Sequence, residues 1–338
     1  MYKALYRTWR PMSFDDVISQ PHITETLQNQ VRTGKTAHAY LFTGSRGTGK
    51  TTCARILAKA VNCPHAVNGN PCLECDICKD ADRGILSDVI EIDAASNNSV
   101  EDIRDLREGT VYRPERCAYK IYIIDEAEKL TQQAQNALLK TIEEPPAYGI
   151  IILLTTNADT FLQTILSRCV RLDFRPLRDT LVTQYLQEKY DLTDYECRFA
   201  TAFAQGKIGR AVTIATSKEF AQLKEEVMHV IRYAKEMTTA EIMAEVKNIA
   251  NYKLTIDDYL DLMAMWYRDV LVFKSTKDSN ALIFKDEMSL LAEQAKNCSY
   301  EGLEDILKSI DKVKLRLKAN VNFDLVIELL IMAIKEAM

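Results

Sequence analysis

A glycine-rich stretch carries the strongest chemical signal in the sequence: Gly44-Ser-Arg-Gly-Thr-Gly-Lys-Thr51. It matches the phosphate-loop pattern G-x-x-x-x-G-K-[ST] at every defined position. Glycines let backbone N–H groups turn inward around phosphate oxygens, and a following helix adds its N-terminal dipole. Lys50 would reach the β- and γ-phosphates, and the Thr51 hydroxyl would hold Mg²⁺. The predicted phosphate-binding residues are Gly44, Ser45, Arg46, Gly47, Thr48, Gly49, Lys50, Thr51 and Thr52.

The flanks of this loop are those that the motif needs. The apolar run 40–42 is typical of a strand, and residues 52–60 are typical of a helix. An ordinary glycine-rich turn is the alternative. It does not require a strand before the loop and a helix after it, so the phosphate-binding interpretation is the stronger one.

A pair of carboxylates supplies the second half of the expected site. The apolar run 121–124 predicts a strand that ends at Asp125 and Glu126. Asp125 would hold Mg²⁺ directly or through water, and Glu126 would orient and polarise an attacking water. Two acids at a strand end are weak evidence alone, because solvated strand ends often carry acids. The phosphate loop upstream favours the catalytic interpretation.

Four of the nine cysteines are closely spaced in the pattern C-x8-C-x2-C-x2-C, as Cys63, Cys72, Cys75 and Cys78. Such spacing lets thiolates reach one ion at about 2.3 Å, and four of them complete a tetrahedron. The pattern predicts a structural Zn²⁺ site. A redox pair is the weaker alternative, because no thioredoxin-like setting surrounds these cysteines. His65 could compete as a ligand but is expected at the surface.

Composition limits the classes of protein that the chain can represent. Its 338 residues suggest two or three domains, and an apolar content of 47% allows a sizeable core. The net charge of −5 argues against nucleic-acid binding by bulk charge, although a local basic surface stays open. No apolar run approaches the ~20 residues of a membrane span, and the N-terminus lacks a signal-peptide pattern. We therefore expect a cytoplasmic protein without a membrane partner.

Periodicity divides the chain into two parts. Strands are expected at 39–43, 88–93, 121–125 and 150–155, and helices at 23–33, 50–62, 99–108 and 131–143. This alternation predicts an α/β fold with a parallel sheet, whose ligand lies at the carboxyl ends of the strands. Beyond 176 the pattern is helical. Residues 323–334 are apolar nearly all round, which indicates a helix buried in a bundle or at a subunit contact.

Beyond these motifs, the chain resembles the bacterial clamp-loader subunits of the AAA+ superfamily, and within them the DNA polymerase III gamma/tau family. The resemblance covers about the first 120 residues: the stretches 2–11, 14–18, 37–42 and 92–98, the phosphate loop and the four-cysteine insertion. It implies an AAA+ ATPase domain over 1–172 with a zinc-binding insertion at 63–78. It further implies an all-α lid over 173–218 and an all-α oligomerisation collar over 219–338.

The resemblance also implies roles for further residues. The S-R-C motif at 167–169 contains Arg168, which the family inserts in trans into the ATP site of a neighbouring subunit as an arginine finger. A surface arginine at a helix end is the alternative. Thr156 falls at the sensor position that reads the γ-phosphate, and Arg210 resembles the sensor arginine of the lid.

Two basic residues match positions where the family faces DNA phosphates. Arg104 lies on the expected helix 99–108, and Lys140 lies near the end of the helix 131–143. Such contacts would add salt-dependent affinity without reading base sequence. A solvated helix face is the alternative for both residues.

Some segments look more like the delta-prime subunit of the same machine: 126–140, 153–157, 209–211 and the C-terminal helices. Ser19 also stands where the family usually has glycine. Because Lys50, Thr51, Asp125 and Glu126 are all present, the resemblance favours a gamma-type ATPase that uses ATP, Mg²⁺ and Zn²⁺. A delta-prime-type stator is the runner-up.

The implied partners are other clamp-loader subunits, a sliding clamp and primer–template DNA. A non-hydrolysing scaffold and a AAA+ helicase or remodeller are the competing functions. The intact phosphate-loop and carboxylate residues argue against the scaffold, and the four-cysteine insertion and the S-R-C motif argue against the remodeller.

Overall fold

The structure is a computed structural model that describes residues 11–338. The resemblance within 2–10 lies outside the described residues. The chain divides into two compact units. The first ends at Val182 and also includes Gln205–Arg210, and the second comprises Thr183–Ala204 and Ala211–Met338. The predicted lid at 173–218 is shared between the two units, and its separate identity stays a prediction.

The first unit is built on a five-stranded parallel sheet with the order β2-β3-β4-β1-β5. Its strands are β1 (Ala39–Thr43), β2 (Val89–Asp93), β3 (Lys120–Asp125), β4 (Gly149–Thr155) and β5 (Val170–Asp173). The four predicted strands are confirmed to within one residue at each end. Strand β5 was not predicted, because only Leu172 is buried in this short strand and its sequence carries little apolar signal.

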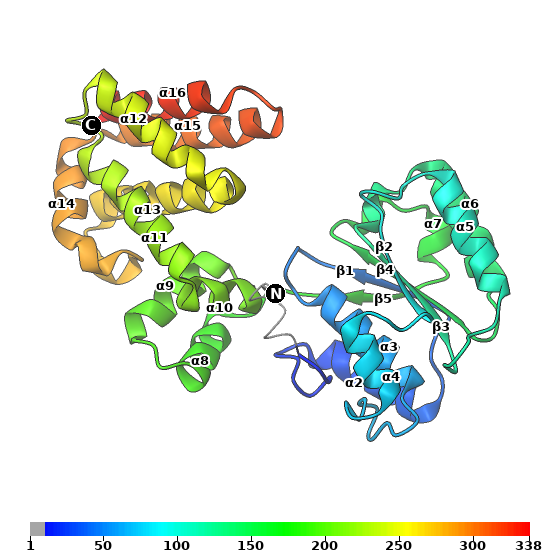
Figure 1. Ribbon diagram of the computed structural model, residues 1–338. Coiled ribbons are helices and arrows are strands. Elements are labelled where there is room, and N and C mark those ends of the chain that lie inside the picture. The colour runs from blue at the N-terminus through cyan, green and yellow to red at the C-terminus, as the bar shows by residue number, and fades with distance from the viewer. Residues whose placement is uncertain (1–10) are drawn as a thin grey trace. The chain divides into compact units, whose positions relative to one another are not determined.

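Helices cover both faces of this sheet (Figure 1). One face packs against α2 (Pro21–Thr33) and α3 (Lys50–Asn62) through strand residues such as Tyr40, Phe42 and Ile123. The other face packs against α5 (Val100–Val111) and α6 (Gln132–Glu143) through alternate residues such as Leu41, Tyr122 and Ile124. Helices α4 (Asp76–Arg83) and α7 (Gln163–Leu166) and the short 3₁₀ turns η1 (Ala127–Lys129) and η2 (Ala158–Thr160) complete the unit.

The second unit consists of helices in the described residues. Two of these helices, α8 (Asp179–Lys189) and α10 (Ile208–Thr216), begin in the first unit. The others are α9 (Asp194–Ala204), α11 (Lys218–Tyr233), α12 (Thr239–Ile249), α13 (Ile256–Thr276), α14 (Met288–Asn297), α15 (Tyr300–Lys318) and α16 (Phe323–Ala337). The 3₁₀ turns of this unit are η3 (Ala250–Thr255), η4 (Ser279–Ala281) and η5 (Lys285–Glu287). Helix α13 is central, because its Trp266, Tyr267 and Leu260 are fully buried. The predicted α/β class followed by helices is confirmed.

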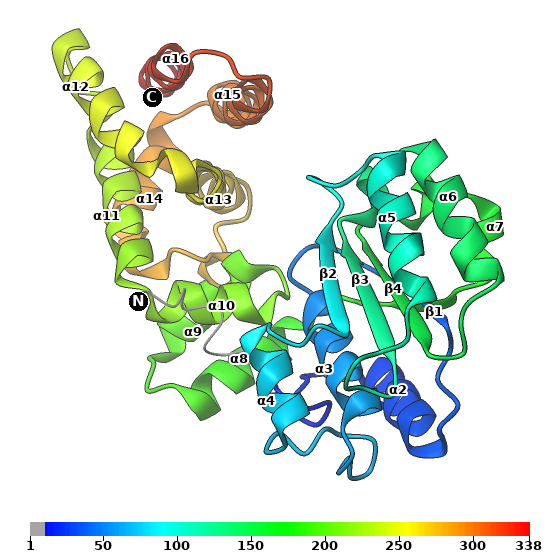
Figure 2. The same ribbon diagram turned by 45° about the vertical axis from the view of Figure 1, so that its right-hand side comes forward.

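Helix α16 packs against α15 and α12, as Figure 2 shows for α15. Its Val326, Leu330 and Ile334 are buried. The predicted burial of this helix in a bundle holds for that face, but one further apolar stripe stays in solvent. That stripe consists of Leu325, Leu329 and Met332, at 52%, 44% and 39% exposure.

A buried carboxylate, that of Asp88, holds the turn that precedes β3. Asp88 is 1% exposed. Its Oδ1 accepts the N–H of Glu115 at 2.8 Å, and its Oδ2 accepts those of Arg116 at 2.8 Å and Cys117 at 3.0 Å. Burial alone would raise the pKa of Asp88, but these three bonds outweigh it and hold the pKa below its usual range. The charged form of Asp88 therefore stabilises the turn that leads into the central strands.

Replacing Asp88 with Asn should lower the free energy of unfolding by about 2 kcal/mol near neutral pH, since an NH₂ group then faces N–H donors. A depressed pKa contributes stability above the unfolded-state value and loses it as the pH falls. The deficit of Asp88→Asn should therefore shrink below about pH 4. Urea unfolding of the wild type and of Asp88→Asn at several pH values measures this difference in the free energy of unfolding. Asp105→Asn, at an exposed position of α5, is the control. Equal stability of Asp88→Asn and the wild type at pH 7 would contradict this role.

Candidate functional site

The phosphate loop leaves β1 and enters α3 through a backbone that requires glycine at two positions. Gly44 has φ +146°, and a Cβ atom there would come within 2.4 Å of the carbonyl oxygen of Phe174. Gly49 has φ +100° and directly precedes α3. The loop thus wraps the amino end of a helix, where unpaired N–H groups and the helix dipole favour phosphate. These residues fit a nucleotide phosphate group.

Lys50 is held inside this loop. Its Nζ donates to the carbonyl oxygens of Gly44 at 2.6 Å and Ser45 at 2.9 Å, and the residue is 8% exposed. Burial lowers the pKa of Lys50 below its usual value, and the nearby charges of Asp125 and Glu128 offset only part of this effect. The ammonium group is therefore placed at the centre of the loop, beside two carboxylates.

The predicted magnesium residues lie together. Thr51 Oγ1 donates to Asp125 Oδ2 at 3.0 Å, so a hydroxyl from the start of α3 meets a carboxylate from the end of β3. Hydroxyl, carboxylate and water oxygens are the ligands that Mg²⁺ prefers. The oxygen donors of Thr51 and Asp125 fit such an ion.

Glu126 follows in a left-handed backbone conformation, with φ +49°. Its side chain lies 3.5 Å from a guanidinium nitrogen of Arg46, which is itself 88% exposed in the phosphate loop. The structure therefore brings the second predicted carboxylate to the loop. The sequence did not indicate that Arg46 would pair with it.

Two further residues at this edge were missed by the sequence analysis. Glu128, in η1, accepts the hydroxyl of Thr156 at 2.7 Å and the backbone N–H of Thr156 at 3.3 Å. Lys207 lies with its side-chain carbons 3.4 to 3.6 Å from the position of a Cβ at Gly47. Thr156 is thus hydrogen-bonded to the turn that follows β3. The segment that contains Lys207 and Arg210 lies beside the phosphate loop at Gly47. A side chain far away in sequence, such as Lys207, leaves no local pattern that could reveal this contact.

Arg168 lies at the other edge of the sheet. Strands β1 and β5 are parallel neighbours, the phosphate loop follows the carboxyl end of β1, and Arg168 precedes the amino end of β5. Its guanidinium group pairs with Glu143 at 3.0 Å and donates to the carbonyl of Thr164 at 3.0 Å. Arg168 is therefore not assembled with the phosphate loop of its own chain.

The two candidate DNA residues lie on neighbouring helices. Arg104 is exposed on α5 and pairs with Glu101 at 2.7 Å, and Lys140 is exposed on α6, which packs against α5. Both lie outside the phosphate-loop edge, on the helical layer over the second face of the sheet.

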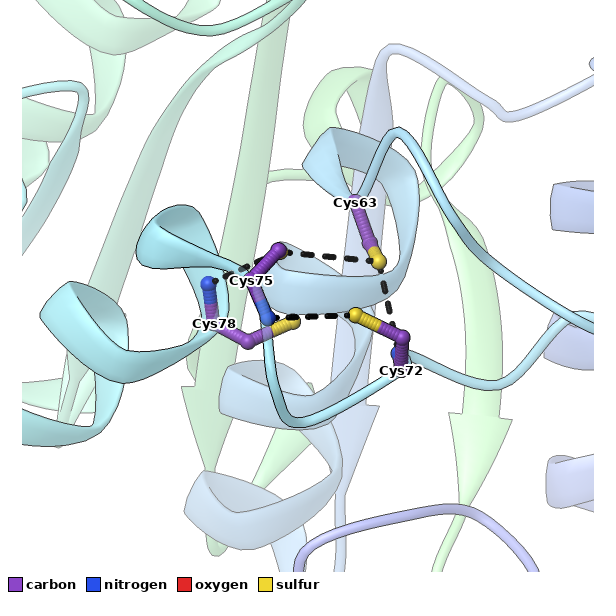
Figure 3. Close-up of side chains that lie close together, drawn as sticks. All are labelled: Cys63, Cys72, Cys75 and Cys78. Atoms are coloured by element: carbon purple, nitrogen blue, oxygen red, sulfur yellow. Dashed lines mark hydrogen bonds between the residues drawn. The ribbon is translucent and has the colours of Figure 1, made fainter.

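The four predicted cysteines converge in space. Cys63 comes from the end of α3, and Cys72, Cys75 and Cys78 come from the following loop and the start of α4 (Figure 3). Their sulfur atoms all lie within 4.8 Å of one another. Thiolates about 2.3 Å from one tetrahedral ion lie slightly under 4 Å apart, so the donor set fits Zn²⁺.

Backbone groups prepare these sulfurs for a cation. The N–H groups of Cys72, Cys75 and Cys78 donate to the sulfurs of Cys63 at 3.3 Å, Cys72 at 3.4 Å and Cys75 at 3.5 Å. Bonds from the N–H groups of Glu74 and Cys75 lower the pKa of Cys72 to about 6, whereas burial raises that of Cys78. The cluster therefore already favours one thiolate, and a bound cation would stabilise the others.

The cysteine loop is docked on the rest of the unit. Gly69 has φ +82°, and a Cβ there would come within 2.4 Å of the carbonyl of Gln28 in α2. Lys59 of α3 pairs at 2.7 Å with Asp82 of α4, and the Lys59 side chain is 4% exposed. The cluster is thus attached to the helix that begins at the phosphate loop, but at its opposite end.

Comparison with known families gives two matches. A family described as "DNA polymerase III, delta subunit" matches residues 19–178, and one described as "DNA polymerase III, delta subunit, C terminal" matches residues 218–336. The second match covers the helices for which the sequence predicted delta-prime-like features. Among the described residues, no helix combines the length and the apolar character needed to cross a membrane.

Individual relatives carry the names gamma and tau. The chain is 37% identical to DNA polymerase III subunit tau of Bacillus subtilis over 339 residues, which cover 93% of this chain and 60% of that relative. It is 30% identical to DNA polymerase III subunit gamma of Buchnera aphidicola subsp. Schizaphis graminum, over 98% of this chain and 97% of that relative. The chain thus spans less than two thirds of the tau protein and nearly all of the gamma protein.

A solved structure shares the fold. The DNA polymerase III gamma subunit-related protein of Thermotoga maritima aligns over 93% of this chain and 98% of its own, with a TM-score of 0.52 and 20% identity. The fold and the matches along the chain agree with the resemblance drawn from the motifs. The chain belongs to the gamma/tau family of bacterial DNA polymerase III subunits.

Proposed function

We propose that this chain is an ATP-hydrolysing subunit of a bacterial clamp loader, which uses ATP to place a sliding clamp on primed DNA during replication. One observation carries the proposal. Lys50, Thr51, Asp125 and Glu126 all lie at the carboxyl edge of one parallel sheet, with Thr51 bonded to Asp125 at 3.0 Å. The name of the B. subtilis relative supports the setting in replication, and we therefore place the protein in the cytoplasm.

Each residue at this edge has a defined task in the proposal. The loop N–H groups and Lys50 bind and orient the β- and γ-phosphates. Thr51 and Asp125 hold Mg²⁺, which when bound offsets phosphate charge. Glu126 orients and polarises the attacking water, and Thr156 and Arg210 contact the γ-phosphate from within the same chain. The other predicted loop residues, Ser45, Thr48 and Thr52, line the phosphates.

Arg168 acts on a neighbouring subunit in this proposal. It lies at the edge of the sheet opposite the phosphate loop, and it is partly exposed, at 40% of its side chain. A guanidinium group there can stabilise charge only in the site of an adjacent chain. The proposed partners are therefore other clamp-loader subunits, together with the sliding clamp and primer–template DNA, which Arg104 and Lys140 would contact.

The domain assignments complete the proposal. We assign residues 1–172 to the ATPase domain, 173–218 to a lid and 219–338 to an oligomerisation collar. The exposed apolar stripe of Leu325, Leu329 and Met332 on α16 supports a subunit contact in the collar. We also assign Cys63, Cys72, Cys75 and Cys78 to a structural Zn²⁺ site, whose bound ion would hold the loop and α4 together.

A delta-prime-type stator is the second candidate. The two family matches, both described as delta subunit, favour it. Such a subunit positions its neighbours without turning over ATP itself. Variants of the phosphate-loop edge distinguish the two functions.

Lys50→Ala should abolish nucleotide binding, because it removes the charge that faces the phosphates. Glu126→Gln should keep binding, since Thr51 and Asp125 remain, but turnover in the assembled complex should fall by about 10² or more. Calorimetry for binding and steady-state phosphate release for turnover measure the two effects. Wild-type turnover by Glu126→Gln in the complex would favour the stator.

Arg168→Ala should leave nucleotide binding by the isolated chain nearly unchanged, but it should slow hydrolysis in the assembly by on the order of 10³. Mixing provides the sharper test. A Lys50→Ala chain still supplies Arg168 to its neighbour, and an Arg168→Ala chain still binds ATP. Mixed assemblies should recover part of the lost activity. If co-assembled mixtures recover nothing at any ratio, the shared site is wrong.

Protein purified without chelator should contain about one zinc per chain, the capacity of one four-thiolate site. Cys75→Ser should lower metal content and the melting temperature far more than it lowers ATP affinity. Cys117→Ser, which removes a thiol outside the cluster, should retain the metal. Elemental analysis, thermal melts and nucleotide titration provide the readouts, and absence of zinc from the wild-type protein would reject the site.

A further inference from the structure

Glu128 is a carboxylate at the phosphate-loop edge to which neither the motif nor the proposed mechanism gives a task. It lies in η1, directly after β3. The turn is fixed on both sides of it, because Ala127 is 0% exposed and Leu130 is 4% exposed. Strand β4, which ends at Thr155, is the neighbour of β3. Glu128 therefore links the ends of two adjacent strands at the place where ATP is proposed to bind.

Both carboxylate oxygens of Glu128 accept hydrogen bonds from Thr156. Oε1 accepts the hydroxyl of Thr156 at 2.7 Å, and Oε2 accepts its backbone N–H at 3.3 Å. An ionised carboxylate can only accept hydrogen bonds, so the hydroxyl of Thr156 must be the donor. A hydroxyl has one proton. While this bond stands, Thr156 cannot donate to a phosphate oxygen.

The charge of Glu128 also bears on the triphosphate. It is one of the two carboxylates whose charge partly offsets the lowering of the Lys50 pKa by burial, so it lies close to the group that would meet the β- and γ-phosphates. Burial raises the pKa of Glu128, but hydrogen bonds from Thr156, from Thr155 and from its own backbone outweigh burial and hold the pKa below its usual value. An incoming γ-phosphate would therefore meet a negative charge and a threonine whose proton is already committed. A diphosphate has no γ group and would not compete.

We propose that Glu128 is a specificity-determining positioning residue, whose carboxylate competes with the γ-phosphate of ATP for the single hydroxyl proton of Thr156. Binding of ATP exchanges the partner of this proton, and binding of ADP does not. Glu128 thereby reduces the preference of the site for ATP and makes engagement of Thr156 depend on a γ-phosphate. The inference rests on the proposed ATP site, and it assigns to that site a control on nucleotide discrimination.

The test is a double-mutant cycle on this 338-residue chain. Dissociation constants are measured by calorimetry with Mg²⁺ for ADP and for an ATP analogue with an imido β–γ bridge. The chains are the wild type, Glu128→Gln, Thr156→Val and the double variant. Glu128→Gln should tighten analogue binding on the order of tenfold, since a neutral amide accepts the proton more weakly. It should change ADP affinity far less, because ADP has no γ-phosphate to compete for that proton.

The Thr156→Val background separates proton competition from charge repulsion. Without the hydroxyl, Glu128→Gln should tighten analogue binding much less. Glu25→Gln, which removes one exposed charge from α2, should change neither constant. ADP binding that is retained in every variant also shows that the loop remains folded.

Two outcomes overturn the inference while leaving the ATP site intact. In the first, Glu128→Gln tightens analogue binding equally with and without the Thr156 hydroxyl. In the second, Glu128→Gln does not change the ratio of the dissociation constants for ADP and for the analogue. A wild-type chain that binds neither nucleotide overturns the proposed ATP site, and this inference with it.

Discussion

Parallel pairing of β3, β4 and β1 is the constraint on which the candidate site depends. Parallel strands end at the same edge of a sheet, so the groups that follow them must meet there. The phosphate loop follows β1, Asp125 and Glu126 end β3, and Thr156 follows β4. Apolar residues on both faces of these strands, packed under α2, α3, α5 and α6, hold the register that brings these groups together.

Polar groups at this edge form hydrogen bonds and ion pairs with one another. Lys50 donates to carbonyls of its own loop, Thr51 to Asp125 and Thr156 to Glu128, while Arg46 lies 3.5 Å from Glu126. A triphosphate must therefore exchange these contacts for its own. Binding energy then depends on differences between partners, and small changes in one carboxylate can alter which nucleotide is preferred. Arg168, bonded to Glu143 at the opposite edge, takes no part in this exchange within its own chain.

Much of this arrangement could be predicted from the sequence, because its determinants are local. Strands buried on both faces have continuous apolar runs in the sequence. The phosphate loop and the C-x2-C steps have characteristic residue types at defined spacings. What was missed depends on tertiary geometry. Glu128 meets Thr156 only because η1 turns it toward the end of β4. An all-round apolar pattern on α16 cannot tell which side lacks a neighbour, and Leu329 therefore proved exposed.

The central claim is that this chain hydrolyses ATP to load a clamp, and steady-state ATP turnover tests it most directly. Turnover should be measured for the chain with its partner subunits, alone and after addition of sliding clamp and primed DNA. The account predicts that clamp and primed DNA together stimulate turnover, and that a Lys50→Ala chain in the same assembly removes its share of that rate. Turnover that is indifferent to clamp and DNA, or to Lys50, would contradict the account.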